Sequence, residues 1–141
     1  MRDLDALLVA AAARPSQASR IVELIQSGAN PNGSCDDLTP IGATISAAYS
    51  TVSAENTVSN LTVLLKHGAR LDVVASGRFL PLHWAVFLNR AEHVDLLLAH
   101  GASPSAFTVG EFPQTALDIA IEHSMDRMIE KLQAARVKGT S

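Results

Sequence analysis

The 141-residue sequence predicts an all-α fold, a solenoid of four stacked helix–turn–helix units joined by short hairpin-like loops. Two recurring patterns support this prediction: amphipathic stretches that end in a Gly-Ala pair, and short segments with the features of a helix start. The composition suits close packing between helices, because the 48% apolar content includes only 4% aromatic residues. At this length the chain is expected to fold as one domain.

The second helix of each unit is predicted from the Gly-Ala pairs. The pairs follow the stretches IVELIQS, LTVLLKH and VDLLLAH. Glycine readily adopts the left-handed conformation that ends a helix, so each pair indicates a helix end. Apolar residues recur before it with the i, i+3, i+4 spacing of one helix face, namely Ile21, Leu24 and Ile25; Leu61, Leu64 and Leu65; and Val94, Leu97 and Leu98.

The first helix of each unit is predicted from three segments that read TPIGAT (39–44), LPLHWA (80–85) and TALDIA (115–120). Thr39 and Thr115 are suitable N-cap residues, and proline is tolerated best in the first helical turn. The buried faces are expected to be Ile41, Thr44 and Ile45; Leu82, Ala85 and Val86; Leu117, Ala120 and Ile121; and, in the first unit, Val9, Ala12 and Ala13.

This pattern resembles the ankyrin repeat, whose helix start reads Thr-Pro-Leu-His-x-Ala and recurs at about 33 residues. Residues 80–85 are the best copy and lack only the Thr, whereas Gly42 and Asp118 stand in place of the His. The resemblance implies a single ankyrin-repeat domain over 1–141. Its units are expected at about 4–37, 38–78, 79–113 and 114–138, with an insertion at 49–60.

The last predicted helix has features of a terminal cap, because Gln133 stands where the other second helices carry Ile or Leu. A polar outer face is what the end of a repeat stack requires. This favours a self-contained unit over the alternative of a segment from a longer protein or an assembly.

The resemblance also implies a concave groove lined by loop tips and by two residues of each first helix. In this sequence those residues are Ala11 and Arg14; Ala43 and Ser46; Trp84 and Phe87; and Ile119 and Glu122. Exposed aromatic clusters usually mark partner sites, so we expect Trp84, Phe87 and Ile119 to bind a protein or peptide. Loop-tip residues are expected to add polar contacts, namely Asp36, Asp37, Ser76, Arg78, Glu111 and Gln114.

Two alternatives to this groove hypothesis stay open. Trp84 and Phe87 could instead pack beneath loops that contain Phe79, Phe107 or Phe112, and the aromatic pair could support a homodimer. The insertion at 49–60 is either a lid over one edge of the groove or a surface insertion that costs little closure entropy.

A second functional hypothesis is a small-molecule binder or an enzyme with cyclase- or isomerase-like acid–base chemistry in the same groove, closed by the 49–60 insertion. His83, Asp118, Glu122 and His123 would supply the acid and base. In ankyrin repeats, however, the His of the motif braces the helix start by hydrogen bonding, and we favour this role for His83 and Asp118. The predicted function is therefore binding without catalysis.

Several classes of partner and cofactor are disfavoured by the sequence. The net charge of −3, without a cluster of Lys and Arg, disfavours nucleic acids and anionic membranes. Scattered His residues lack zinc-ligand spacing and there is no phosphate-binding loop, so no metal or cofactor is expected. The single Cys35 agrees with a reducing compartment, the cytoplasm or the nucleus, and we expect no secretion.

Overall fold

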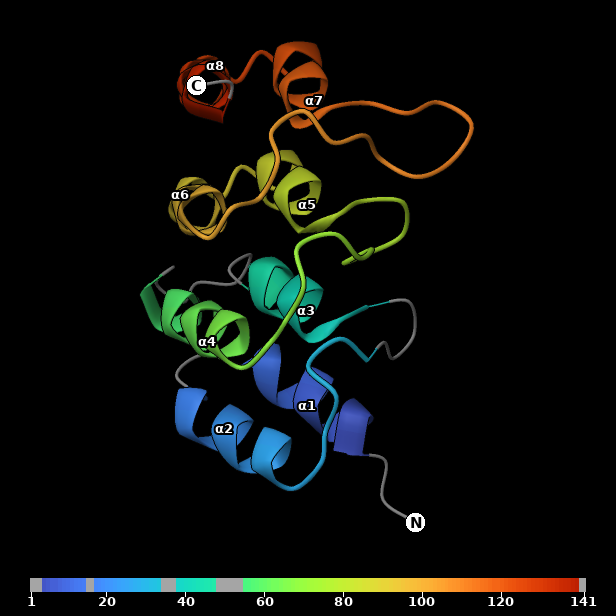
Figure 1. Ribbon diagram of the computed structural model, residues 1–141, viewed down its shortest axis with the longest axis vertical. Helices are drawn as coiled ribbons and strands as arrows, with labels where there is room; N and C mark the ends of the chain where they lie inside the picture. The colour runs from blue at the N-terminus through green and yellow to red at the C-terminus, as the bar shows by residue number, and fades with distance from the viewer. Residues whose placement is uncertain (1–3, 15–16, 34–37, 48–54, 140–141) are drawn as a thin grey trace.

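The computed structural model describes residues 4–14, 17–33, 38–47 and 55–139. Within these ranges the regular structure consists of α-helices, joined by loops with isolated β-bridges (Figure 1). The helices form four pairs, which we number as units 1 to 4: α1 (Leu4–Ala12) and α2 (Ala18–Gln26); α3 (Pro40–Ala47) and α4 (Glu55–Lys66); α5 (Pro81–Phe87) and α6 (Ala91–Ala99); α7 (Ala116–Glu122) and α8 (Asp126–Gly139). The predicted all-α solenoid is confirmed.

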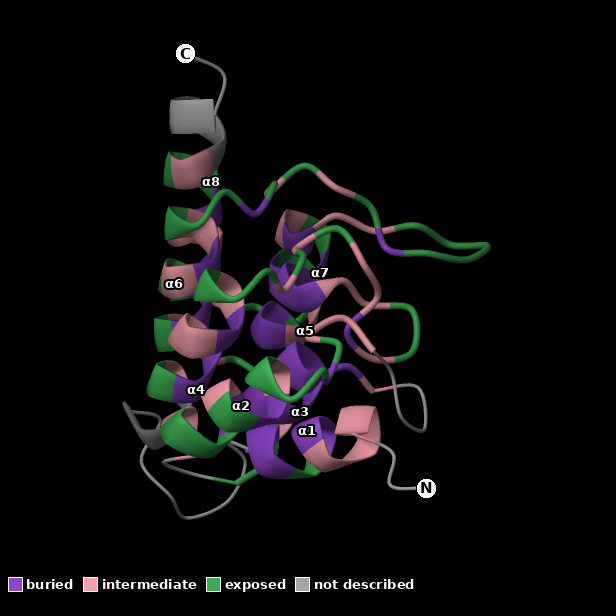
Figure 2. Cartoon of the chain, turned by 60° about the horizontal axis from the view of Figure 1, so that its bottom comes forward, coloured by how far each residue is buried: buried purple, intermediate pink, exposed green. Residues whose placement is uncertain are grey.

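The helices are arranged in two layers. The first helices, α1, α3, α5 and α7, form one layer, and the second helices, α2, α4, α6 and α8, form the other (Figure 1). Each helix packs on its partner within the unit and on its counterpart in the next unit. The loops between units project from the side of the first helices (Figures 1 and 2). Contacts between neighbouring units therefore maintain the stack.

The core lies between the two layers (Figure 2). Most residues predicted to be buried are buried, including Ile45 and Val86 at 0% exposure. The prediction was wrong for Ile121, which is 55% exposed, and for Ala13, which is exposed. Ile121 occupies the position of Ile45 and Val86, but in the described part of the chain no further first helix follows α7 to cover it. Ala13 lies just beyond the end of α1.

The helix ends follow the predicted capping. Thr39 Oγ1 accepts a hydrogen bond from Gly42 N at 3.2 Å, and Thr115 Oγ1 accepts one from Asp118 N at 3.1 Å. Such caps satisfy backbone donors that have no partner within the helix. The glycines that follow α2, α4 and α6 have positive φ angles, at Gly28 (112°), Gly68 (98°) and Gly101 (95°).

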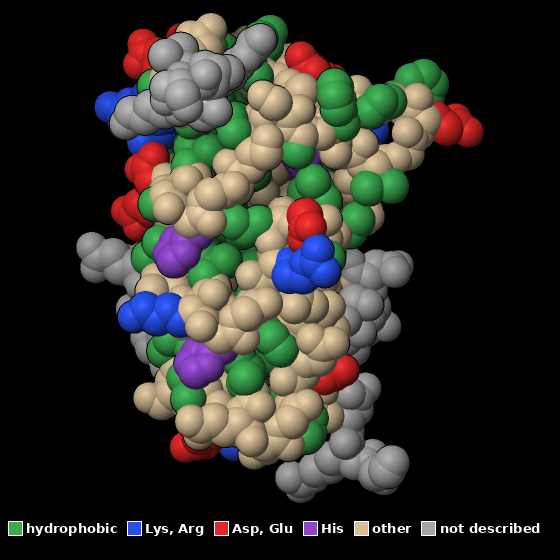
Figure 3. Space-filling model, viewed as in Figure 1, with side chains coloured by type: hydrophobic (Ala, Val, Ile, Leu, Met, Phe, Trp, Pro, Cys, Tyr) green, Lys and Arg blue, Asp and Glu red, His purple; other side chains and the backbone are tan. Residues whose placement is uncertain are grey.

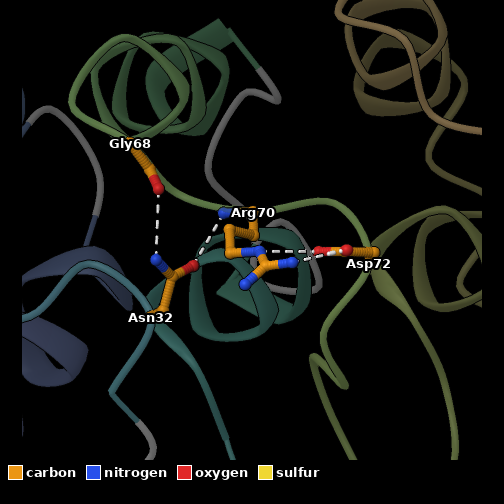
Figure 4. Close-up of polar contacts among 4 residues, drawn as sticks. All are labelled: Asn32, Gly68, Arg70 and Asp72. Carbon is orange, nitrogen blue, oxygen red and sulfur yellow. Dashed lines mark hydrogen bonds and ion pairs between the residues drawn. The ribbon is translucent and has the colours of Figure 1, made fainter.

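Side chains also tie successive units together. Asn32, in the loop after α2, donates from Nδ2 to Gly68 O at 3.1 Å and accepts at Oδ1 from Arg70 N at 2.6 Å (Figure 4). Arg70 in turn forms an ion pair with Asp72 at 2.7 Å. A single amide thus joins the loop of unit 1 to the loop of unit 2.

The insertion at 49–60 lies partly outside the described residues, at 49–54. Residues 55–60 form the beginning of α4, which has 12 residues, whereas α2 and α6 have 9 each. Asn60 is buried and donates from Nδ2 to Arg14 O at 2.6 Å, while its Oδ1 accepts from Gln17 N at 2.9 Å. The described part of the insertion therefore extends a helix and braces the turn between α1 and α2.

Candidate functional site

Three aromatic side chains pack together at the inner side of unit 3. Trp84 and Phe87 lie one turn apart on α5, and Phe79 precedes the same helix. The ring centroids are separated by 5.1 Å (Phe79–Phe87), 5.8 Å (Phe79–Trp84) and 6.0 Å (Trp84–Phe87), and the planes lie within 27° of one another. Phe87 is 40% exposed, and the other two rings are half-buried. This aromatic cluster (Phe79, Trp84 and Phe87) thus presents Phe87 to solvent.

Trp84 is held by a hydrogen bond to unit 2. Its indole Nε1–H donates to Gly42 O, in α3, at 3.0 Å. Gly42 occupies the position at which the best repeat copy has His83. A Cβ at this position would collide with the Ala75 carbonyl oxygen and would lie 2.9 Å from the Leu38 side chain. Glycine is therefore required here by the close approach of the loop that follows α4.

Polar and charged side chains surround the aromatic cluster on the side of Phe79 and Phe87. The Arg78 guanidinium lies 5.3 Å from the Phe79 ring centroid and donates to Gln114 Oε1 at 3.2 Å. Gln114 Nε2 donates to Glu122 Oε2 at 2.7 Å. His123, the next residue along the chain, meets the Phe87 ring edge-on at 5.7 Å. The contacts close a circuit, which we call the contact ring: Phe79, Phe87, Arg78, Gln114, Glu122 and His123.

The loop between α6 and α7 positions Gln114 in this ring. Thr108 N donates to Gln114 O at 2.8 Å, and Thr108 Oγ1 accepts from Gln114 N at 2.9 Å. Val109 N donates to Arg78 O at 3.0 Å, which ties this loop to the loop before α5. The Thr108 side chain is buried, so these bonds form within an enclosed turn. Arg78 and Gln114 are thus brought together by backbone pairing between neighbouring loops.

The structure brings several predicted residues together and separates others. Trp84, Phe87, Arg78 and Gln114 were predicted as binding contacts, whereas Glu122 and His123 were named for the enzyme hypothesis. All six lie within or beside the contact ring. Their role in binding stays a prediction.

Ile119 was predicted to line the groove, but its side chain is only 1% exposed. Ala43 and Ala11, which have the same position in α3 and α1, are also buried. In α5 this position points back toward the preceding unit, because Trp84 bonds to Gly42 O. Only the large indole remains half-buried there, so the prediction that Ile119 is accessible to a partner was wrong.

The remaining loop residues have varied surroundings. Asp36 and Asp37 lie outside the described residues. Glu111 is exposed on the loop after α6, and Ser76 is half-buried and pairs with Phe79 through its backbone. Phe107 and Phe112, considered above as a cover for the aromatic pair, are 61% and 76% exposed. Hydrophobic side chains gather where the loop between α6 and α7 projects from the stack (Figure 3).

The sequence suggests Phe79 only as a packing neighbour of Trp84 and Phe87, but in the structure its ring contacts both Phe87 and the Arg78 guanidinium. Its place immediately before the LPLHWA segment was the available signal.

His83 and Asp118 brace their own helices. His83 Nδ1 accepts from Leu80 N at 3.3 Å, and its Nε2 lies 2.9 Å from Ala106 O, so the Nε2–H tautomer satisfies both bonds. Burial lowers the pKa of His83. Asp118 Oδ2 accepts from Thr115 N at 3.0 Å. The bracing interpretation is confirmed, and both nitrogens of His83 are engaged with backbone groups rather than with a carboxylate.

A cavity of about 750 Å³ lies between α6 and α8. It is lined mainly by small and apolar residues, with the ion pair of Asp95 and Lys131 (2.9 Å) at its edge. None of the four residues named for acid–base chemistry lines it. Across the described ranges, no group of three or more His, Cys, Asp or Glu is placed to hold a metal ion. Within the same ranges, no helix has the length and apolar character needed to cross a membrane.

Comparison with known proteins agrees with this architecture. The family model described as ankyrin repeats (3 copies) matches residues 7–108, which is more than half of the chain. The chain is also 36% identical to the BCL-6 corepressor-like protein 1 of Homo sapiens over 69 residues, or 49% of its own length. That stretch covers 4% of the human protein, so the similarity concerns a small part of this relative.

Proposed function

Since this chain belongs to the ankyrin-repeat family, whose repeats generally mediate protein–protein interaction, we propose that it binds a segment of another protein at the contact ring, without catalysis. The observation that carries this proposal is the closed circuit of contacts around the half-exposed ring of Phe87. It combines an apolar anchor point with charged and amide groups from two neighbouring units.

The rigidity of the site supports a role in binding. The aromatic cluster is fixed by mutual packing and by the bond from Trp84 to Gly42, so little side-chain entropy would be lost when a partner covers it. Aromatic residues of this kind dominate the energetics of many interfaces, particularly when polar groups surround them. Arg78 and Gln114 supply such groups at the edge of Phe79.

A protein or peptide is favoured over a polyanion as the partner. The net charge is −3, and Lys and Arg side chains are few and separated on the face in Figure 3. A small-molecule ligand is the alternative, but the cavity between α6 and α8 lies away from the contact ring. We place the interaction in the cytoplasm or nucleus, on the evidence of the single cysteine.

The proposal is tested by affinity capture with wild type, Phe87→Ala and Phe112→Ala, followed by mass spectrometry of bound proteins and small molecules. Phe112 is 76% exposed and is not a member of the contact ring, so it provides the same substitution at an exposed side chain outside the ring. We expect a protein retained by wild type and Phe112→Ala and reduced about tenfold or more with Phe87→Ala.

Equal recovery by all three proteins would place the interaction elsewhere. A retained small molecule, with no protein enriched, would favour the alternative ligand class. Circular dichroism of each variant establishes that the helices are intact before capture.

A further inference from the structure

The contact ring lies at the ends of two neighbouring helices. Phe87 is the last residue of α5 and Glu122 is the last residue of α7, and these helices pack against each other. The carbonyl groups at a helix C-terminus carry partial negative charge. Glu122 is exposed and adds a carboxylate next to His123, whose ring meets Phe87 edge-on. The local potential at this end of the ring therefore favours a cation.

The positive charge of the ring lies on the other side of the Gln114 amide, because Arg78 bonds to Gln114 Oε1 whereas Glu122 bonds to Gln114 Nε2. The Arg78 guanidinium faces Phe79 and Gln114, and the Gln114 amide separates it from Glu122. In the part of the chain that the structure describes, no Lys, Arg or His forms an ion pair with Glu122. The neighbouring acid, Asp118, is used as a helix cap. The Glu122 carboxylate is thus held in place by a neutral amide, and its other oxygen has no bond to a cationic side chain among the described residues.

On the basis of the proposed function, we infer that the partner segment places a basic side chain, Lys or Arg, over Phe87 and against Glu122. A cation gains both the electrostatic attraction of an aromatic ring and a charge-assisted hydrogen bond to the carboxylate. The methylene stem of Lys or Arg also covers the aromatic cluster.

Other anchors fit this surface less well. An acidic side chain would be repelled by the negative charge of Glu122 and by the partial negative charge at the C-terminal ends of α5 and α7. A purely apolar anchor would remove water from the carboxylate without offering a partner in return.

The experiment begins with a displayed library of random peptides, selected on the immobilised full chain. Selected peptides are synthesised, and their affinities are measured by the fluorescence of Trp84, the single tryptophan of the chain, which lies in the aromatic cluster. Each Lys or Arg of the peptide is replaced by neutral norleucine. We expect one replacement to lower the affinity for wild type about tenfold and to have little effect on the affinity for Glu122→Gln.

The variants are matched for structure and charge. Glu122→Gln retains an oxygen that can accept the bond from Gln114, so the ring is expected to persist. Glu130→Gln makes the same change at an exposed residue of α8 outside the ring, and it should leave peptide affinity within about twofold of wild type.

The outcomes separate this inference from the function on which it rests. Peptides that lose binding with Phe87→Ala but show no coupling between a basic residue and Glu122 would overturn the inference and leave the proposed function standing. A selection that yields no peptide sensitive to Phe87→Ala would overturn both.

Discussion

His93 is a fully buried imidazole on α6. Burial, together with the nearby charge of Arg90, lowers the pKa of His93 to about 4 from an ordinary value of 6.5. It occupies the same place in α6 that the buried Asn60 occupies in α4, one residue before the first apolar residue of the helix core. A neutral polar side chain is therefore the form that the folded protein accepts at this position.

This burial predicts that stability depends on pH. Between about pH 6.5 and 4 the unfolded chain takes up a proton at His93, whereas the folded chain does not. The free energy of unfolding should therefore fall as the pH decreases through this window, by up to about 3 kcal/mol from this residue. His83, whose pKa is also lowered, acts in the same direction. Urea unfolding at pH 7, 6, 5 and 4, followed by circular dichroism, measures the slope.

The control for this effect is His93→Asn, which installs the side chain that unit 2 uses. Its pH dependence should be shallower than that of wild type over the same window. An identical slope in the two proteins would assign the pH dependence to other groups.

Part of the residue-level detail could be predicted from the sequence. The Thr caps and the bracing roles of His83 and Asp118 follow from local rules, because each side chain bonds to backbone within its own helix start. The burial of Ile119 could not be predicted in the same way. Helical periodicity indicates the side of a helix on which a residue lies, but the neighbouring unit determines whether that side is covered.

Among the loops, the amide of Asn32 has no equivalent in the next unit. Asn32 and Asp72 each lie four residues after the glycine that ends a second helix. Asn32 can donate to Gly68 O and accept from Arg70 N at once, whereas an ionised carboxylate can only accept. Asp72 instead bonds to Arg70, whose guanidinium lowers the pKa of that carboxyl, mainly through the hydrogen bond. The loops of units 1 and 2 are thus joined by a bond that a carboxylate cannot make.

We therefore expect Asn32→Asp to destabilise the protein by about 1 to 2 kcal/mol, because it removes the donor to Gly68 O and places a negative charge beside that carbonyl. The reverse change, Asp72→Asn, disrupts only an exposed ion pair and should have little effect. Thermal and urea unfolding of both variants compares the two positions. If the two variants lost similar amounts of stability, the hydrogen bonds of Asn32 would contribute no more to folding than the exposed ion pair of Arg70 and Asp72.

At the scale of the whole stack, the described residues leave part of one face of α7 exposed. Ile45, Val86 and Ile121 hold the same position in successive first helices, but their exposures are 0%, 0% and 55%. The first two belong to helices on which a further first helix packs, α5 on α3 and α7 on α5, whereas in the described part of the chain no first helix follows α7. Position within the stack, rather than residue type, decides the burial of these three side chains.

Replacing Ile by Ala at two of these positions should therefore lower the free energy of unfolding by different amounts. Ile45→Ala removes fully buried groups and is expected to lower the free energy of unfolding by about 2 to 5 kcal/mol. Ile121→Ala should cost less than about 1 kcal/mol, because much of that side chain already contacts solvent. Urea titration of the two variants provides the comparison. A cost at Ile121 as large as that at Ile45 would indicate that another molecule covers α7 in solution.

The stack itself was predictable because repeated helix starts and helix ends specify its geometry locally. The contact ring was not, although most of its members had been named. Arg78, Gln114 and Glu122 belong to different loops and helices, and Arg78 lies 36 residues from Gln114. Their meeting depends on how two loops pair across neighbouring units, which spacing along the chain does not encode.

The hydrogen bond from Trp84 to Gly42 has a consequence for cooperativity. In a stack of units, local opening usually begins at an end and spreads inward. The Trp84 indole packs on Phe87 and is also hydrogen-bonded to the backbone of α3. Separation of unit 2 from unit 3 would therefore break this bond and disturb the aromatic cluster. A molecule bound only to the native cluster would, by thermodynamic linkage, also suppress fraying in unit 2. Amide hydrogens in α3, which need not touch the bound molecule, would then exchange more slowly with solvent.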